Sequence, residues 1–102
     1  MPIPVLPRDL LEVFASLRSD DDISAILYDL LTPAELEALG ERWEIVKLLA
    51  GGMSQRAVRD RLGVSVTTVG RGSRQLRYGS GGFEIAFDEL KQLGKDDPRS
   101  TL

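Results

Sequence analysis

Apolar residues recur along this chain at intervals of three and four, the spacing of amphipathic helices. The pattern breaks at residues that start or end helices, such as Ser19, the pair Thr32-Pro33, and Gly51-Gly52. No stretch of useful length alternates apolar and polar positions as a strand does. The sequence therefore predicts an all-α fold of six helices. Their approximate ranges are 8–17, 23–31, 33–50, 55–62, 66–76 and 83–93.

The third predicted helix is the longest and begins with a strong start signal. Thr32 can cap it, Pro33 loses nothing by its missing N–H, and Glu35 completes a capping box. Trp43 is expected in the core. Residues 95–102 are polar and are expected to fray. The inward stripe of the third predicted helix is expected to hold Leu36, Leu39, Trp43, Val46, Leu49 and Ala50.

A tight turn joins the fourth and fifth predicted helices. Ser54 and Ser65 can cap the two helices, and Gly63 suits the turn because it has no Cβ to hinder a positive φ. This arrangement is typical of a helix-turn-helix, so residues 54–77 are predicted to form a DNA-reading head. Apolar residues are placed to form the contact between its helices: Val58, Leu62, Val64 and Val69.

Composition and charge decide what such a head could bind. The chain has 102 residues, 42% of them hydrophobic, which suits one domain over residues 1–102. Its net charge of −3 argues at first against a nucleic-acid partner. However, residues 54–78 hold six arginines against the single acid Asp60, whereas residues 1–41 hold two basic and nine acidic side chains. Because phosphates respond to the local field, the basic segment favours DNA.

Several classes of protein are disfavoured by what the sequence lacks. Without cysteine or histidine, disulfides, thiolate metal sites and the commonest general base are all excluded. We therefore expect no enzyme, no catalytic residue and no metal site. The first residues do not read as a signal peptide, and no apolar run is long enough to span a bilayer. A soluble cytoplasmic protein is expected.

The residues that would read DNA lie near the starts of the two helices of the head. Val66, Thr67 and Gly70 are predicted to face the major groove, where apolar surface suits thymine methyl groups. Arg56 is the candidate for a bidentate contact to guanine, and Arg59 for a phosphate contact. Arg59 stands where such motifs often have a small residue, so its head group would have to reach outward. The alternative is a basic helical module that docks on an acidic protein.

Residues 30–76 resemble the Trp repressor family, the tryptophan-controlled repressors of bacterial tryptophan operons. The segments LTPAELEALGER, MSQR and TVGRGS are specific in combination, although one residue fewer than usual falls near residues 50–52. The resemblance implies an intertwined homodimer that represses transcription. Independently of the resemblance, a symmetric dimer would place two reading helices about 34 Å apart over a palindromic operator.

The resemblance also implies a pocket for a corepressor, L-tryptophan or a related indole, with no other cofactor. Carried over by position, Arg42 and Arg71 would flank the indole ring, and Arg71 would pair with the ligand carboxylate. Thr32 would bond the same carboxylate, while Val46 and Gly72 would line the ring. Arginine planes can both stack on aromatic rings and bind carboxylates.

Two departures from the family pattern leave the identity of the corepressor undecided. Gln75 stands where the family has a serine that touches the ligand's amino group, and Gly70 replaces a hydroxyl residue of the reading helix. In addition, residues 77–90, RYGSGGFEIAFDEL, resemble a broader Trp-repressor-like group whose members lack an established corepressor. The alternative is therefore a DNA-binding regulator with an altered corepressor or none.

Overall fold

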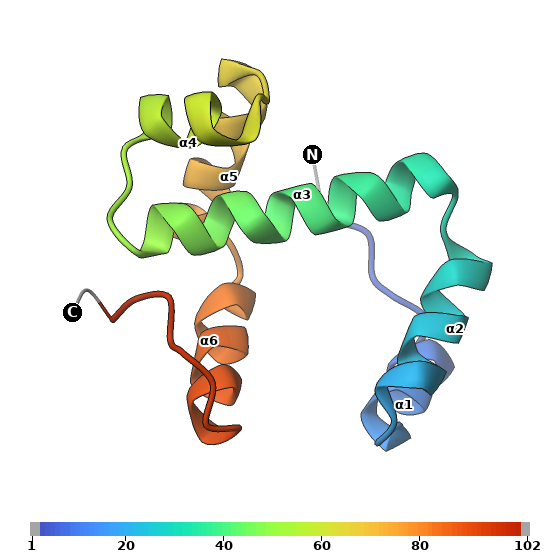
Figure 1. Cartoon of the computed structure of the whole chain (residues 1–102). Helices are drawn as coiled ribbons and strands as arrows, with labels where there is room; N and C mark the ends of the chain where they lie inside the picture. The colour runs from blue at the N-terminus through green and yellow to red at the C-terminus, as the bar shows by residue number, and fades with distance from the viewer. Residues whose placement is uncertain (1–2, 101–102) are drawn as a thin grey trace. The chain divides into compact units, whose positions relative to one another are not determined.

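The computed structural model describes residues 3–100, and this part of the chain contains α-helices and no strand (Figure 1). The predicted all-α class with six helices is confirmed. No helix within the described range is long and apolar enough to cross a membrane. The helices are α1 (Arg8–Ser16), α2 (Asp20–Leu30), α3 (Pro33–Ala50), α4 (Gln55–Leu62), α5 (Val66–Tyr78) and α6 (Gly82–Gln92).

The start of α2 differs from the sequence prediction. The helix begins at Asp20 rather than Ile23, because the Ser19 hydroxyl accepts a hydrogen bond of 3.3 Å from the Asp22 backbone N–H. The acidic run at residues 20–22 is therefore the first turn of the helix, where negative charge complements the helix dipole.

The predicted capping box at the start of α3 is confirmed. The Thr32 backbone N–H donates to Glu35 Oε1 over 2.9 Å, and the Glu35 backbone N–H donates to Thr32 Oγ1 over 3.2 Å. The hydrogen bond from the Thr32 backbone N–H, with a further contribution from the Thr32 side chain, holds the pKa of the Glu35 carboxyl below its usual value, because it favours the ionised form. Local sequence alone thus fixes where the longest helix begins.

The chain divides into two compact units, residues 1–37 and residues 38–102, and each is described by itself. The first unit holds α1, α2 and the first turn of α3. Neither α1 nor α2 contains a buried residue, although both carry large apolar side chains. Those left exposed on the two helices include Leu11, Val13, Tyr28 and Leu30.

The second unit has a core where α3, α4 and α5 meet. Ile45, Val58 and Val69 are fully buried there, one from each helix. Ile45 was not in the predicted inward stripe of α3, and Leu39, which was, is 49% exposed. The stripe prediction was therefore incomplete, because α3 carries apolar residues on two faces. Further apolar side chains pack around this core: Leu48, Leu49, Met53, Leu62 and Val64.

A second cluster in the same unit is aromatic and joins α3 to α6. The Trp43 ring lies 5.7 Å from the Phe87 ring and 6.5 Å from the Phe83 ring, centroid to centroid. Phe87 is fully buried, whereas Trp43 and Phe83 are half-buried. The core position predicted for Trp43 is therefore confirmed only in part.

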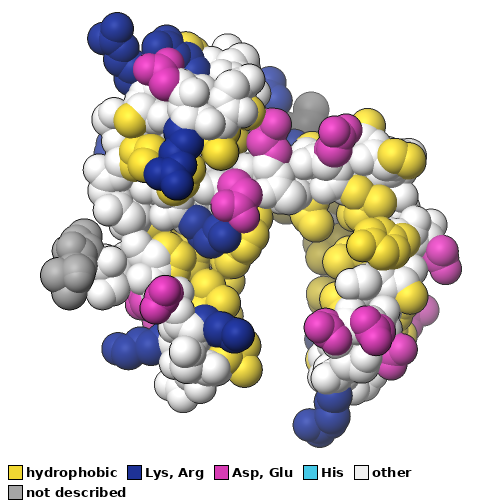
Figure 2. Space-filling view, in the orientation of Figure 1, with side chains coloured by type: hydrophobic (Ala, Val, Ile, Leu, Met, Phe, Trp, Pro, Cys, Tyr) yellow, Lys and Arg dark blue, Asp and Glu magenta, His cyan; other side chains and the backbone are white. Residues whose placement is uncertain are grey.

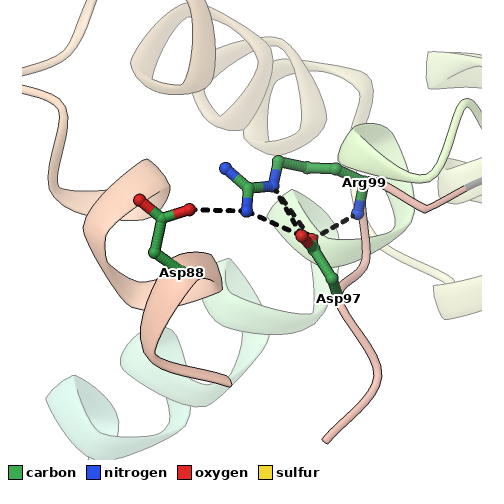
Figure 3. Close-up of polar contacts among 3 residues, drawn as sticks. All are labelled: Asp88, Asp97 and Arg99. Carbon is green, nitrogen blue, oxygen red and sulfur yellow. Dashed lines mark hydrogen bonds and ion pairs between the residues drawn. The ribbon is translucent and has the colours of Figure 1, made fainter. Parts of the chain in front are cut away.

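Residues 95–100, which were expected to fray, make several hydrogen bonds within the protein. The Lys95 backbone N–H donates to the Leu90 carbonyl over 2.9 Å, and Arg99 is bonded to Asp97 and Asp88 (Figure 3). These bonds fix residues 95–100, while residues 101–102 lie outside the described part. Polar composition alone was thus a poor guide to order here.

Candidate nucleic-acid interface and neighbouring pocket

The helices α4 and α5 are joined by a short turn and pack directly against each other. Gly63 closes α4 in the left-handed region with φ of +68°, so the sequence argument for glycine at this position is confirmed. Ser54 accepts a hydrogen bond of 3.1 Å from the Ala57 N–H, and Ser65 accepts one of 3.1 Å from the Thr68 N–H. Each helix of the head therefore starts with the cap that its sequence predicts.

Two further contacts fix the angle between these helices. Val58 and Val69 are both fully buried in the core that the helices share with Ile45. At the start of α4, the Gln55 Nε2 group donates to the Ser73 hydroxyl over 3.2 Å. The first turn of α4 is thereby tied to the middle of α5, so the two helices present their outer residues as one surface.

The predicted DNA-reading residues lie on that surface. Arg56 and Thr67 are exposed, Val66 is 59% exposed, and Gly70 is half-buried. A shallow hollow of about 370 Å³ brings Arg56, Arg59 and Val66 together. Thr67 and Gly70 lie on the same helix as Val66 but do not line this hollow. Two arginines and two valines thus line one hollow, a combination that suits both hydrogen-bonded and apolar contacts to base edges.

Arg59 is already engaged within the protein. Its Nε and Nη2 atoms donate to Asp60 Oδ1 over 3.0 Å and 2.9 Å, and its side chain is 36% exposed. Because exposed ion pairs are weak, a phosphate group could replace Asp60 as the partner. The Arg59 head group therefore reaches the surface, where it meets a competing carboxylate.

The charges are unevenly placed on the face drawn in Figure 2. Lysine and arginine side chains gather over the part that holds α4, whereas acidic side chains gather over the part that holds α1 and α2 (Figure 2). The helix-turn-helix thus presents a basic surface even though the whole chain is acidic. A phosphate backbone would be attracted to this surface.

A pocket of about 170 Å³ lies between α3 and α5, with Phe83 of α6 at its edge. It brings together five of the six residues predicted to bind a ligand. The sixth, Thr32, lies in residues 1–37, where it caps α3. The lining residues are Ala38, Glu41, Arg42, Val46, Thr68, Arg71, Gly72, Gln75 and Phe83.

The pocket combines an apolar base with two cationic groups. Val46 and Gly72 are buried, whereas Arg42 and Arg71 are exposed. Guanidinium groups above apolar surface can accept a planar aromatic ring together with a carboxylate. Gly72 has a second role, because a Cβ at this position would lie 2.8 Å from Ile45 Cγ2. It therefore allows α3 and α5 to approach closely.

Four lining residues were not predicted from the sequence: Ala38, Glu41, Thr68 and Phe83. Thr68 lies one helical turn before Arg71, and Ala38 lies one helical turn before Arg42, so helical spacing could have suggested both. Glu41 is adjacent to Arg42, and adjacent helical residues do not share a face, so spacing gave no signal for it. Phe83 had no such signal, because it follows the glycine-rich break at residues 79–82. Within residues 3–100, no group of three or more His, Cys, Asp or Glu side chains is placed to hold a metal ion.

Sequence comparisons identify the family to which the chain is similar. The family model described as Trp repressor protein matches residues 8–91. The chain is 38% identical over 90 residues to a Trp operon repressor homolog of Vibrio parahaemolyticus, which covers 84% of each protein. It is 45% identical over 67 residues to the homolog of Photobacterium profundum, or 65% of this chain and 63% of that protein. It is also 30% identical over 88 residues to the uncharacterized protein YerC of Bacillus subtilis, or 83% and 85%. No solved structure matches significantly.

Proposed function

This chain belongs to the Trp repressor family, a family of DNA-binding regulators rather than enzymes, and we propose that it is a dimeric transcriptional repressor controlled by L-tryptophan or a related indole. One observation carries the proposal. A helix-turn-helix that exposes Arg56, Val66 and Thr67 shares α5 with a pocket that holds Arg42 and Arg71. A ligand in that pocket would therefore act on the same helix that reads the operator.

The DNA contact would use the two helices of the head differently. The first residues of α5 would enter the major groove, and α4 would brace across the backbone. Arg56, which lies at the start of α4 and lines one hollow with Val66, would reach a guanine edge. Arg59 would exchange Asp60 for a phosphate. This division of roles separates specificity from general affinity.

Exposed apolar side chains of the first unit support a homodimer. No residue of α1 or α2 is buried within one chain. Small helical domains often complete their core through a second copy, and we infer that the two chains of the homodimer intertwine through this unit. Symmetry would then require a palindromic operator, with half-sites about 34 Å apart.

A regulator with an altered corepressor, or with none, is the second candidate. Glu41 and Gln75 both line the pocket, and together they add a carboxylate and a bulky amide beside the two arginines. A carboxylate repels the acid group of an amino acid but attracts its ammonium group, so Glu41 does not by itself select against L-tryptophan. The bulky Gln75 amide, which can donate or accept a hydrogen bond, favours a ligand that differs from L-tryptophan at its polar end.

Substituting Arg56 is expected to relax DNA specificity. Operator sites are first selected from random DNA with the unaltered protein, and binding to selected and random duplexes is then compared. Arg56→Ala should lose about 1–3 kcal/mol of discrimination, because a bidentate base contact disappears. Arg59→Ala is the matched control and should weaken both duplexes alike.

Equal losses on both duplexes for the two variants would contradict these assignments. An unaltered protein that binds only random DNA, with a steep salt dependence, would instead favour the basic module that docks on an acidic protein. Selected sites without two-fold symmetry would argue against the palindromic operator.

Titration calorimetry with L-tryptophan tests the corepressor. We expect saturable binding to the unaltered protein and none to Arg71→Ala, because the carboxylate would lose its cationic partner. Arg74→Ala is the control, since Arg74 is exposed on the same helix and does not line the pocket. A flat isotherm with the unaltered protein would reject L-tryptophan and leave the DNA-reading proposal standing.

A further inference from the structure

Residues 95–100, which we call the strap, fold back after α6 and are fastened through Arg99 (Figure 3). Arg99 Nη2 donates to Asp97 Oδ2 and to Asp88 Oδ1, each over 2.7 Å. Arg99 Nε donates to Asp97 Oδ1 over 2.9 Å, and the Arg99 backbone N–H donates to the same oxygen over 2.9 Å. The Arg99 guanidinium group therefore bonds Asp97 within the strap and Asp88 on α6.

The strap touches α6 and the end of α3. Beside the Asp88 pair on α6, the Arg99 guanidinium carbon lies 5.7 Å from the centre of the Phe87 ring. Near the end of α3, the Pro98 carbonyl oxygen lies 3.1 Å from the position that a Cβ on Gly51 would take. Glycine at position 51 thus leaves room for the strap to pass. The strap bridges α6 and the residue that directly follows α3.

The strap can affect the pocket, because it contacts α6 and α6 carries Phe83. The Phe83 ring lies 6.4 Å from the Phe87 ring and 6.5 Å from the Trp43 ring, and Phe83 also lines the pocket with Arg42 and Arg71. Phe83 and Phe87 are one helical turn apart, so they move together if α6 moves. A shift of α6 would therefore open or close the pocket on this side.

We propose that the strap, fastened by Arg99, positions α6 so that Phe83 forms a wall of the pocket between α3 and α5. The family match ends at residue 91, so this device lies in a part of the chain outside that match. Arg99 acts as a positioning residue, since it reaches the pocket only through α6. Its hydrogen bonds to Asp97 lower the pKa of that carboxyl to about 2, so the pair stays ionised at neutral pH. The consequence for ligand binding rests on the function proposed above.

The first test compares Arg99→Ala with Lys95→Ala. Both substitutions remove one positive charge from the strap, but Lys95 is exposed and does not line the pocket. We expect Arg99→Ala to raise the hydrogen-exchange rates of α6 amides several-fold and to leave those of α4 and α5 unchanged. Trp43 is the only tryptophan, so its fluorescence reports on this cluster alone, and its emission should move to longer wavelength as water reaches it. Lys95→Ala should change neither measurement.

A second variant dislodges the strap without removing a charge. In Gly51→Ala the new methyl group would press on the Pro98 carbonyl, whereas in Gly40→Ala it would meet nothing within 4 Å. Gly51→Ala should therefore reproduce the α6 exchange and the Trp43 emission of Arg99→Ala, and Gly40→Ala should not. Two unrelated substitutions with the same local signature would support positioning by the strap.

Either of two results would overturn the proposal. One is an Arg99→Ala protein whose α6 exchange and Trp43 emission match those of the unaltered protein. The other is exchange that rises equally in all helices, since this would mean a general loss of stability. If L-tryptophan binds the unaltered protein, Arg99→Ala should also weaken that binding several-fold. If L-tryptophan does not bind, it is rejected as the corepressor. The hydrogen-exchange rates of α6 and the Trp43 emission then test the positioning role of the strap on their own.

Discussion

Replacing Phe87 with alanine is expected to lower the free energy of unfolding by about 3–5 kcal/mol. Its ring is fully buried, lies 5.7 Å from the Trp43 ring and is covered by the Arg99 guanidinium. Removing the ring would leave a cavity where α3, α6 and the strap meet, and few side chains nearby could fill it. Urea denaturation followed by circular dichroism would measure the change.

Gln92→Ala on the same helix is the control for this measurement. Gln92 is exposed at the last turn of α6, so its loss should change the free energy of unfolding by no more than about 0.5 kcal/mol. A Phe87→Ala protein as stable as this control would show that α6 is not packed on Trp43 in solution.

Replacing Gly72 with alanine is expected to destabilise the protein by about 1–3 kcal/mol. The added Cβ would lie 2.8 Å from Ile45 Cγ2, and Ile45 is itself fully buried beside Val58 and Val69. Either α5 moves away from α3 or Ile45 leaves its favoured rotamer, and both responses distort the helix-turn-helix. DNA affinity should therefore fall together with the thermal midpoint.

Gly70→Ala is a closely matched control, because it adds the same methyl group to the same helix. The nearest atom to its Cβ would be Gln55 Oε1 at 4.0 Å, so no clash arises. Alanine is the better helix former by about 1 kcal/mol, so this variant should be more stable than the unaltered protein. If Gly72→Ala were equally stabilised, the close approach of α3 and α5 would be disproved.

Much of the fold was predictable because its signals are local. The serine and threonine caps, the glycine at position 63 and the three-to-four spacing of apolar residues each depend on a few neighbouring positions. Ile45 escaped the prediction because α3 is apolar on two faces, and a single stripe could describe only one of them. The early start of α2 was missed because residues 20–22 are all acidic, so the spacing of apolar residues placed the first helical residue at Ile23.

The pocket was predictable only through the family resemblance, whereas the DNA-reading residues were predicted from the helix caps, the turn and the charges of residues 54–77. Helical spacing puts Arg71 and Gln75 on one face of α5, but nothing in the sequence indicates that Arg42 of α3 lies beside them, as it does in the structure. Phe83 could not be predicted, since its position depends on how α6 packs on Trp43. The strap was missed for a related reason, because the ion pairs of Arg99 leave no periodic pattern in the sequence.

The pairing of Arg59 with Asp60 has a consequence for how the protein searches a genome. When Arg59 meets a phosphate it gives up a carboxylate partner, so the contact gains less free energy at any site than the same contact from an unpaired arginine would. The head would thus adhere less to random DNA than its six arginines suggest, and the time spent on wrong sequences would be shorter. Selectivity would come as much from weakened general attraction as from the base contacts of Arg56.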